Sequence, residues 1–288
     1  MLDLANFGQI VLPVTKCTAD DLEFKYVQFG LIIPSIMRRL EIYMLASLLS
    51  ITTLKDVNIQ DLNLIVTAIS APNAREVGNY QRLEFIGDSV LKLCTSIQLI
   101  AEYPLWHEGY LSYKKDMLVS NARLSRASIE SGLDKFIITK AFTGHKWRPL
   151  YTKDLLQQPR GGKRNMSSKV LADVVEALLG AAMLDGGINK VLACLQIFLP
   201  ELEWQPLEAR RLSLYDRAPD VELPPTLQPL EELVGYVFKK KSLLIEAMSH
   251  ASCISGSASL ERFEFLGDSI LDSLVVDALR NYQEELVS

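Results

Sequence analysis

The chain has 288 residues, a formal net charge of −5 and a hydrophobic fraction of 49%. This length provides for about two domains with cores of their own, and no stretch reaches the roughly 18 uncharged apolar residues that a membrane helix needs. The four cysteines are far apart in the sequence, which argues against a zinc site or a disulfide framework and favours an intracellular compartment, without deciding between cytoplasm and nucleus.

The first part of the chain is predicted to be helical. In residues 1–60 the apolar side chains between positions 36 and 49 recur at helical spacing, which indicates a helical connector. From residue 61 onward helical patterns follow at 62–70, from about 80, around 113–132 and at 169–184. Strand-like alternation is absent from the sequence pattern, so we expect an all-α fold with a first domain over residues 61–200.

A basic segment interrupts this first domain. Between residues 110 and 170 there are thirteen basic and four acidic side chains, a local charge of +9, and the helical periodicity fades over residues 136–166. A loop of this length in a compact domain is usually functional. Clustered positive charge is typical of proteins that contact a phosphate backbone, although a solvated lysine-rich surface has the same composition.

Residues 201–229 contain five prolines and predict an extended linker between domains. Residues 230–288 then begin a second helical domain. The eleven residues Gln81–Leu91 reappear as Glu261–Leu271 with seven identities and an offset of 180 residues. A repeat at this distance indicates a duplicated domain, and we expect the second copy to be incomplete because the chain ends soon after the repeated segment.

The repeated segment and the helix predicted at 169–184 each carry a pair of carboxylates. Glu84 and Asp88 are four residues apart, and Asp173 and Glu176 are three apart, so each pair shares one helix face. Burial of such groups is costly unless a positive charge compensates. Oxygen ligands without histidine or cysteine suit Mg²⁺ or Mn²⁺, which predicts phosphodiester hydrolysis. Salt bridges to neighbouring lysines and arginines are the structural alternative.

Two segments resemble the acidic signatures of the ribonuclease III family. They are Arg82–Ser89 and Leu171–Gly180, and they occur in the family's order. Two such domains in tandem resemble the C-terminal part of fungal Dicer-like proteins, above all the second of their two types. The resemblance implies an all-helical, divalent-metal endonuclease that cuts double-stranded RNA into short duplexes with 5′-phosphate and 3′-hydroxyl ends, for RNA silencing and antiviral defence. It also implies that the two domains pair with each other.

Carried over by position, the resemblance assigns roles to individual residues. The metal ligands would be Glu84, Asp88, Asp173 and Glu176, with Asp88 and Glu176 the most critical for catalysis. Phe85 and Phe265 resemble an aromatic residue that packs between paired domains, although ordinary core burial explains them equally well. The residues expected near RNA or in accessory roles are Glu108, Lys114, Lys115, Arg160, Lys163, Arg164 and Lys169.

The chain also departs from the family pattern. Gln81 stands where the second copy and the family have glutamate (Glu261 in the second copy). This puts in doubt a role of position 81 in the shell outside the four metal ligands. The second copy retains Glu264 and Asp268 as a partial metal site, but no counterpart of Asp173 and Glu176 follows them. Two alternatives therefore remain beside the nuclease, namely a catalytically silent protein that binds double-stranded RNA, and a fragment that is inactive because its second site is incomplete.

Overall fold

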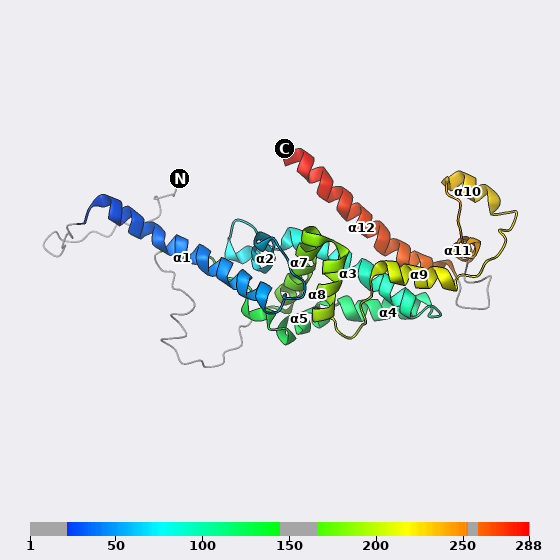
Figure 1. The fold of residues 1–288 in the computed structure, drawn as a ribbon, viewed down its shortest axis with the longest axis horizontal. Helices are drawn as coiled ribbons and strands as arrows, with labels where there is room; N and C mark the ends of the chain where they lie inside the picture. The colour runs from blue at the N-terminus through cyan, green and yellow to red at the C-terminus, as the bar shows by residue number, and fades with distance from the viewer. Residues whose placement is uncertain (1–21, 145–165, 251, 253–258, 288) are drawn as a thin grey trace.

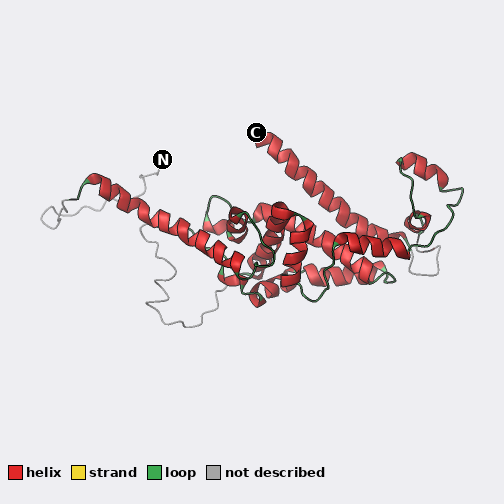
Figure 2. Cartoon of the chain, viewed as in Figure 1, coloured by secondary structure: helices red, strands yellow, loops and turns green. Residues whose placement is uncertain are grey.

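The fold of the chain is helical throughout its described part. The computed structural model describes residues 22–144, 166–250, 252 and 259–287. Within these residues the cartoon shows helices and loops and no strand (Figure 2). The only strand-like feature of the described residues is an isolated bridge between Ser70 and Ile138. The prediction of an all-α fold is confirmed. None of the described helices is long and apolar enough to cross a membrane.

The described part of the chain contains helices of very different lengths. In chain order they are α1 (Phe24–Ile51), α2 (Leu62–Ile69), η3 (Pro72–Ala74), α3 (Gln81–Glu102), α4 (Glu108–Val119), α5 (Asn121–Glu130), η4 (Leu133–Lys135), α7 (Ser168–Gly186), α8 (Ile188–Phe198), α9 (Leu207–Arg217), α10 (Gln228–Val234), α11 (Lys241–Ala247) and α12 (Leu260–Val287).

Helix α7 lies at the centre of the main body, packed against α2, α3, α5 and α8 (Figure 1). It is buried from Leu171 to Ala182 without interruption, which explains why its sequence is apolar on every face. The helix begins at Ser167, whose hydroxyl accepts a hydrogen bond from the backbone N–H of Val170 at 3.3 Å. This cap satisfies one of the free amide groups at the helix start.

Helices α3 and α7 cross in direct backbone contact at two glycines. A Cβ atom placed on Gly87 of α3 would overlap the carbonyl oxygen of Glu176, and one placed on Gly180 of α7 would overlap the carbonyl oxygen of Leu83. Both obstacles are backbone atoms, which no side-chain rotation relieves. The sequence therefore requires glycine at both positions, and the close crossing sets the distance between the acidic side chains of the two helices.

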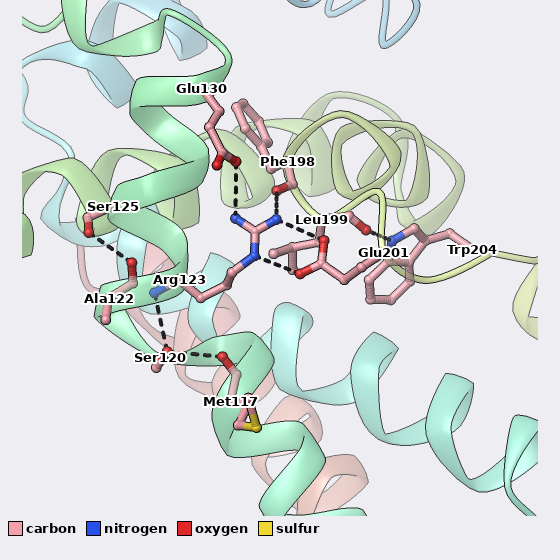
Figure 3. A network of polar contacts seen from close by, with 10 residues as sticks. All are labelled: Met117, Ser120, Ala122, Arg123, Ser125, Glu130, Phe198, Leu199, Glu201 and Trp204. Atoms are coloured by element: carbon pink, nitrogen blue, oxygen red, sulfur yellow. Dashed lines mark hydrogen bonds and ion pairs between the residues drawn. The ribbon is translucent and has the colours of Figure 1, made fainter.

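A polar network fastens α5 to the end of α8. The Arg123 guanidinium donates to Glu201 at 2.6 and 2.8 Å and to the carbonyl oxygen of Phe198 at 3.2 Å (Figure 3). Its remaining nitrogen lies 3.7 Å from a carboxylate oxygen of Glu130. The indole N–H of Trp204 donates to the carbonyl oxygen of Leu199 at 2.7 Å in the same turn. These bonds hold the segment that follows α8 against α5.

Helices α1 and α12 extend away from the body (Figure 1). Helix α1 is buried only in its second half, through Ile42, Ala46 and Leu49. Helix α12 packs its first half on α3 and α4. A Cβ atom placed on Gly267, the repeat of Gly87, would meet no other atom within 4 Å, so the second copy of the motif lacks the helix crossing of the first within the described residues.

Two expectations need correction or restriction. The segment 201–229 is not extended throughout, because α9 forms within it and packs along α3. In the predicted basic loop 136–166, Ile137 and Ile138 are buried in the core, and residues 145–165 lie outside the described part.

The glycine crossing yields a test of the packing. We expect Gly87→Ala and Gly180→Ala each to lower the free energy of unfolding by at least about 2–3 kcal/mol, because the helices must move apart. Gly267→Ala is the matched control: with open space around it, alanine should be neutral or stabilise the helix by about 0.5–1 kcal/mol. Equal effects of the three substitutions in denaturant titrations would contradict the close crossing.

Candidate metal centre

The α3–α7 crossing brings three acidic side chains together. One carboxylate oxygen from each of Glu84, Asp173 and Glu176 lies within 4.8 Å of the others. Asp173 and Glu176 are only 3% and 7% exposed, whereas Glu84 is partly accessible. Three converging carboxylates at the edge of a buried helix provide a donor set that suits a hard divalent cation.

The fourth predicted ligand, Asp88, stands beside this cluster. Its Oδ2 accepts a hydrogen bond from the Lys92 ammonium group at 2.6 Å, one helical turn further along α3. Its oxygens are outside the 4.8 Å group, but its negative charge helps to raise the pKa of Glu176. The structure thus brings three of the four carboxylates together and places the fourth within electrostatic reach.

Lys169 and Tyr80 complete the surroundings of Asp173. The Lys169 ammonium lies 3.2 Å from an oxygen of Asp173 and 3.7 Å from one of Glu84, and the Tyr80 hydroxyl donates to the other Asp173 oxygen at 3.1 Å. Burial of the hydroxyl, followed by the negative charge of Asp173 and its hydrogen bond, raises the pKa of Tyr80. Tyr80 is a site residue that sequence reasoning missed, since only the folded chain shows its contact.

Glu176 is the strained member of the cluster. Burial, followed by the charges of Asp88 and Asp173, raises its pKa to about 8. In the described part of the chain no group donates a hydrogen bond to its carboxylate or forms an ion pair with it. Burial likewise raises the pKa of Glu84, aided by Asp173. Four carboxylates share two lysines, so the centre retains an excess of negative charge that a divalent cation would neutralise.

Asp185, on the same helix, shows how a structural carboxylate differs. Its burial favours the neutral form, but this is outweighed by hydrogen bonds from Lys190 and from the backbone N–H groups of Gln60 and Asp61, so its pKa is lowered. An acidic side chain that only supports the fold is supplied with donors in this way. Glu176 has none, and this contrast favours a metal-binding role for the cluster over a purely structural one.

Comparisons with known proteins agree with this geometry. A family model described as the ribonuclease III domain matches residues 81–187, the segment that contains both acidic pairs. Over that segment the chain is similar to ribonuclease III domains. It is 49% identical to Dicer-like protein 2 of Coccidioides immitis over 93% of this chain, and 46% identical to that of Pyricularia oryzae, also over 93%. The predicted likeness to fungal Dicer-like proteins is confirmed.

The chain spans about a fifth of the length of these relatives, 19% and 18% respectively. Among solved structures, it is similar to the nuclease domain of ribonuclease III from Campylobacter jejuni. The sequence identity is 24%, the TM-score is 0.39, and the match covers 51% of this chain and 96% of the other.

The other residues predicted around the ribonuclease III domain have diverse environments. Glu108 begins α4 and accepts a hydrogen bond from Ser112. Lys115 lies over the ring of Phe265 at 4.6 Å, and Lys114 is partly buried on the same helix. Lys169 pairs with the acidic cluster, as described above. Arg160, Lys163 and Arg164 are outside the described residues, so their predicted role stays a prediction.

The second copy of the motif is less enclosed than the first copy. Glu264 and Asp268 are exposed on α12 and belong to no acidic cluster within the described residues. Phe265 is 4% exposed and packs between α12 and α4, whereas Phe85 is 53% exposed. The expectation of packing between the copies therefore describes Phe265 and not Phe85.

The raised pKa of Glu176 predicts an unusual pH dependence of the metal-free protein. Its folded-state value of about 8 lies above the ordinary 4.5, so the stabilisation by the protonated form is complete below pH 4.5 and is lost as the pH rises through 8. In EDTA we expect Glu176→Gln to flatten this fall in the free energy of unfolding and to be more stable than the wild type at pH 8.5.

Asp185→Asn is the control on the same helix, with a pH dependence of stability opposite to that expected for Glu176. Because the pKa of Asp185 is lowered, its contribution to stability is present above the ordinary value of 3.8 and is lost as the pH falls. The substitution should cost about 1–3 kcal/mol at pH 7. If denaturant titrations showed Glu176→Gln to be destabilising at pH 8.5 as well, Glu176 would have unseen donors and the cluster would be structural.

Proposed function

We propose that this chain is the nuclease part of a divalent-metal-dependent endoribonuclease that cuts double-stranded RNA. The observation that carries the proposal is the cluster of Glu84, Asp173 and Glu176, within the segment that matches the ribonuclease III domain. The fungal Dicer-like relatives support a role in producing short RNA duplexes for silencing and antiviral defence, in an intracellular compartment.

The residues of the centre would divide the work as follows. Glu84, Asp173 and Glu176 would hold Mg²⁺ or Mn²⁺, and Asp88 would join them when Lys92 gives up its contact. A bound ion of this kind polarises a phosphoryl oxygen and lowers the pKa of a water molecule. Tyr80 keeps the Asp173 carboxylate in position through its hydrogen bond. Glu176 releases the proton that its raised pKa retains, since a ligand must be ionised.

Lys169 changes partners in this account. Without a cation it neutralises Asp173 and Glu84, and it is 68% exposed, so it is free to swing outward. We infer that it then meets a phosphate of the RNA, together with Lys114 and basic residues of the segment 136–166. Recognition of double-stranded RNA through phosphates and 2′-hydroxyls gives little sequence preference. The expected products carry 5′-phosphate and 3′-hydroxyl ends.

A catalytically silent protein that binds double-stranded RNA is the second candidate. It is favoured by the ion pairs of Lys169 with Asp173 and of Lys92 with Asp88, which partly neutralise the carboxylates without any metal. The unclustered acids of the second copy favour it as well. The excess charge and the raised pKa of Glu176 oppose it, since a lasting structural role would have supplied this side chain with donors.

Cleavage of an end-labelled RNA duplex by the 288-residue chain in Mg²⁺ separates the two candidates. We expect cutting by the wild type and a loss of at least about 100-fold in Glu176→Gln and in Asp88→Asn, since each removes a charge that the metal needs. Glu208→Gln, which alters an exposed carboxylate paired with Arg211 on the same helix, should cut within twofold of the wild type. RNA binding is measured in parallel in Ca²⁺ by fluorescence anisotropy.

A wild-type chain that binds the duplex but never cuts it, in Mg²⁺ or Mn²⁺, would support the silent protein. Cutting that survives Glu176→Gln unchanged would place the active centre elsewhere. Loss of both binding and cutting in Glu176→Gln, with unchanged unfolding behaviour, would show that the side chain serves RNA binding and not the reaction.

A further inference from the structure

Helix α12 packs antiparallel to α3. Ser269 of α12 has its hydroxyl oxygen 2.7 Å from that of Ser96, while Arg262, earlier on α12, donates to the carbonyl oxygen of Pro104, which follows α3. Later positions of α12 therefore meet earlier positions of α3. Because the two helices carry the same motif 180 residues apart, this register relates them by an approximate two-fold axis.

The axis passes through the point where a position meets its own repeat. In the register set by Ser96 and Ser269, this point falls between positions 92 and 93 of α3 and between positions 272 and 273 of α12, so Lys92 and its repeat Asp272 lie next to the axis. The two copies therefore differ in charge next to the axis. Burial lowers the pKa of Lys92, but the hydrogen bond to Asp88 and the charges of Asp88 and Asp272 raise it overall.

A second difference between the copies also lies at this contact. Glu261 of α12 has an oxygen 3.1 Å from Nε2 of His107, whereas the first copy has Gln81 at the repeated position. The neighbouring positions of the motif are identical or conservative. These two charge differences thus face the other copy, and each is matched there by an opposite charge or an ionisable partner.

Other pairings of the same surfaces would lose these matches. Two first copies, from two chains, would place Lys92 against Lys92 and would set Gln81 opposite His107. Two second copies would place Asp272 against Asp272. Like charges in direct opposition are unfavourable, and discrimination between partners commonly depends on such repulsion.

One contact favours the opposite outcome. Ser89 is buried and has no hydrogen-bond partner in the described part of the chain. The two-fold equivalent of the Ser96–Ser269 contact pairs it with Val276, which offers no hydrogen bond from its side chain. Two first copies would give Ser89 a serine partner. Pairing of two first copies therefore gains a hydrogen bond between neutral groups. Selective pairing of a first with a second copy requires that the repulsion between the two Lys92 side chains outweigh this gain.

We propose that Lys92 and Asp272 determine which copies of the motif pair. The α3 surface, which carries the first copy, then accepts α12, which carries the second copy, and rejects the α3 surface of a second chain. The inference concerns pairing alone and does not depend on whether the domain cuts RNA. The partner that fits this surface is defined by its chemistry, an antiparallel helix with a carboxylate at the axis and another opposite His107.

Disulfide trapping in the 288-residue chain tests the proposal. Ser96→Cys with Ser269→Cys, in a background with Cys17→Ser and Cys253→Ser, should cross-link within the chain, and the rate reports docking of α12. We expect Lys92→Asp and Asp272→Lys each to slow this reaction about threefold to tenfold, by replacing an attraction with a repulsion. The double reversal should restore the rate to within twofold, and 1 M NaCl should shrink all differences.

Mixing the two single reversals gives a second readout. The first copy of the Lys92→Asp chain then matches the second copy of the Asp272→Lys chain, so cross-links between chains should exceed those in either variant alone. Lys55→Asp changes the net charge equally in an exposed segment between α1 and α2, and should leave the rate unchanged.

The Asp272→Lys arm keeps the test decisive should Lys92→Asp disturb the main body, because Asp272 is exposed on α12. Single reversals that cross-link at the wild-type rate would overturn the proposal. Slowing that the double reversal does not rescue would overturn it too, since each residue would then act independently of the other.

Discussion

The direct backbone contact between α3 and α7 is the constraint on which the site depends. Gly87 and Gly180 let the two helices approach until carbonyl oxygens fill the space that side chains would occupy. At this separation carboxylates from different helices come within a few ångströms of each other. Larger residues at these positions would push the two helices apart and separate the acidic side chains. The same two positions therefore determine both the packing of the core and the geometry of the acidic cluster.

The crossing also fixes the electrostatics. Glu176 is held where burial and neighbouring negative charges oppose its ionisation, while Lys169 and Lys92 offset part of the charge. Asp185, whose side chain on α7 is 4% exposed, receives hydrogen bonds that lower its pKa. Helix α7 therefore carries one carboxylate, Asp185, whose charge is stabilised by hydrogen bonds within the fold. Within the described residues Glu176 lacks such donors, and a cation would stabilise the negative charge of its cluster.

The sequence predicts much of this arrangement, for identifiable reasons. The uniformly apolar stretch around Asp173 and Glu176 indicates a helix buried on all sides, and an exact repeat of Glu84 and Asp88 indicates chemistry. The ion pair of Lys169 with Asp173 is local, and salt bridges of this kind are the structural alternative that the sequence offers. The hydrogen bond from Tyr80 to Asp173 joins distant segments, and such contacts are not local properties of a sequence, so the sequence does not predict it. Helix α9 was missed because its flanking prolines suggested an extended chain, although they stand outside the helix itself.

The central claim is that the acidic cluster binds a divalent cation. Anomalous diffraction from crystals of the 288-residue chain soaked in Mn²⁺ tests it most directly. The account predicts a single strong peak within coordination distance of Glu84, Asp173 and Glu176, with the Lys169 ammonium displaced from Asp173. Crystals in which Lys169 still bridges Asp173 and Glu84, with no peak at the cluster at millimolar Mn²⁺, would contradict the account.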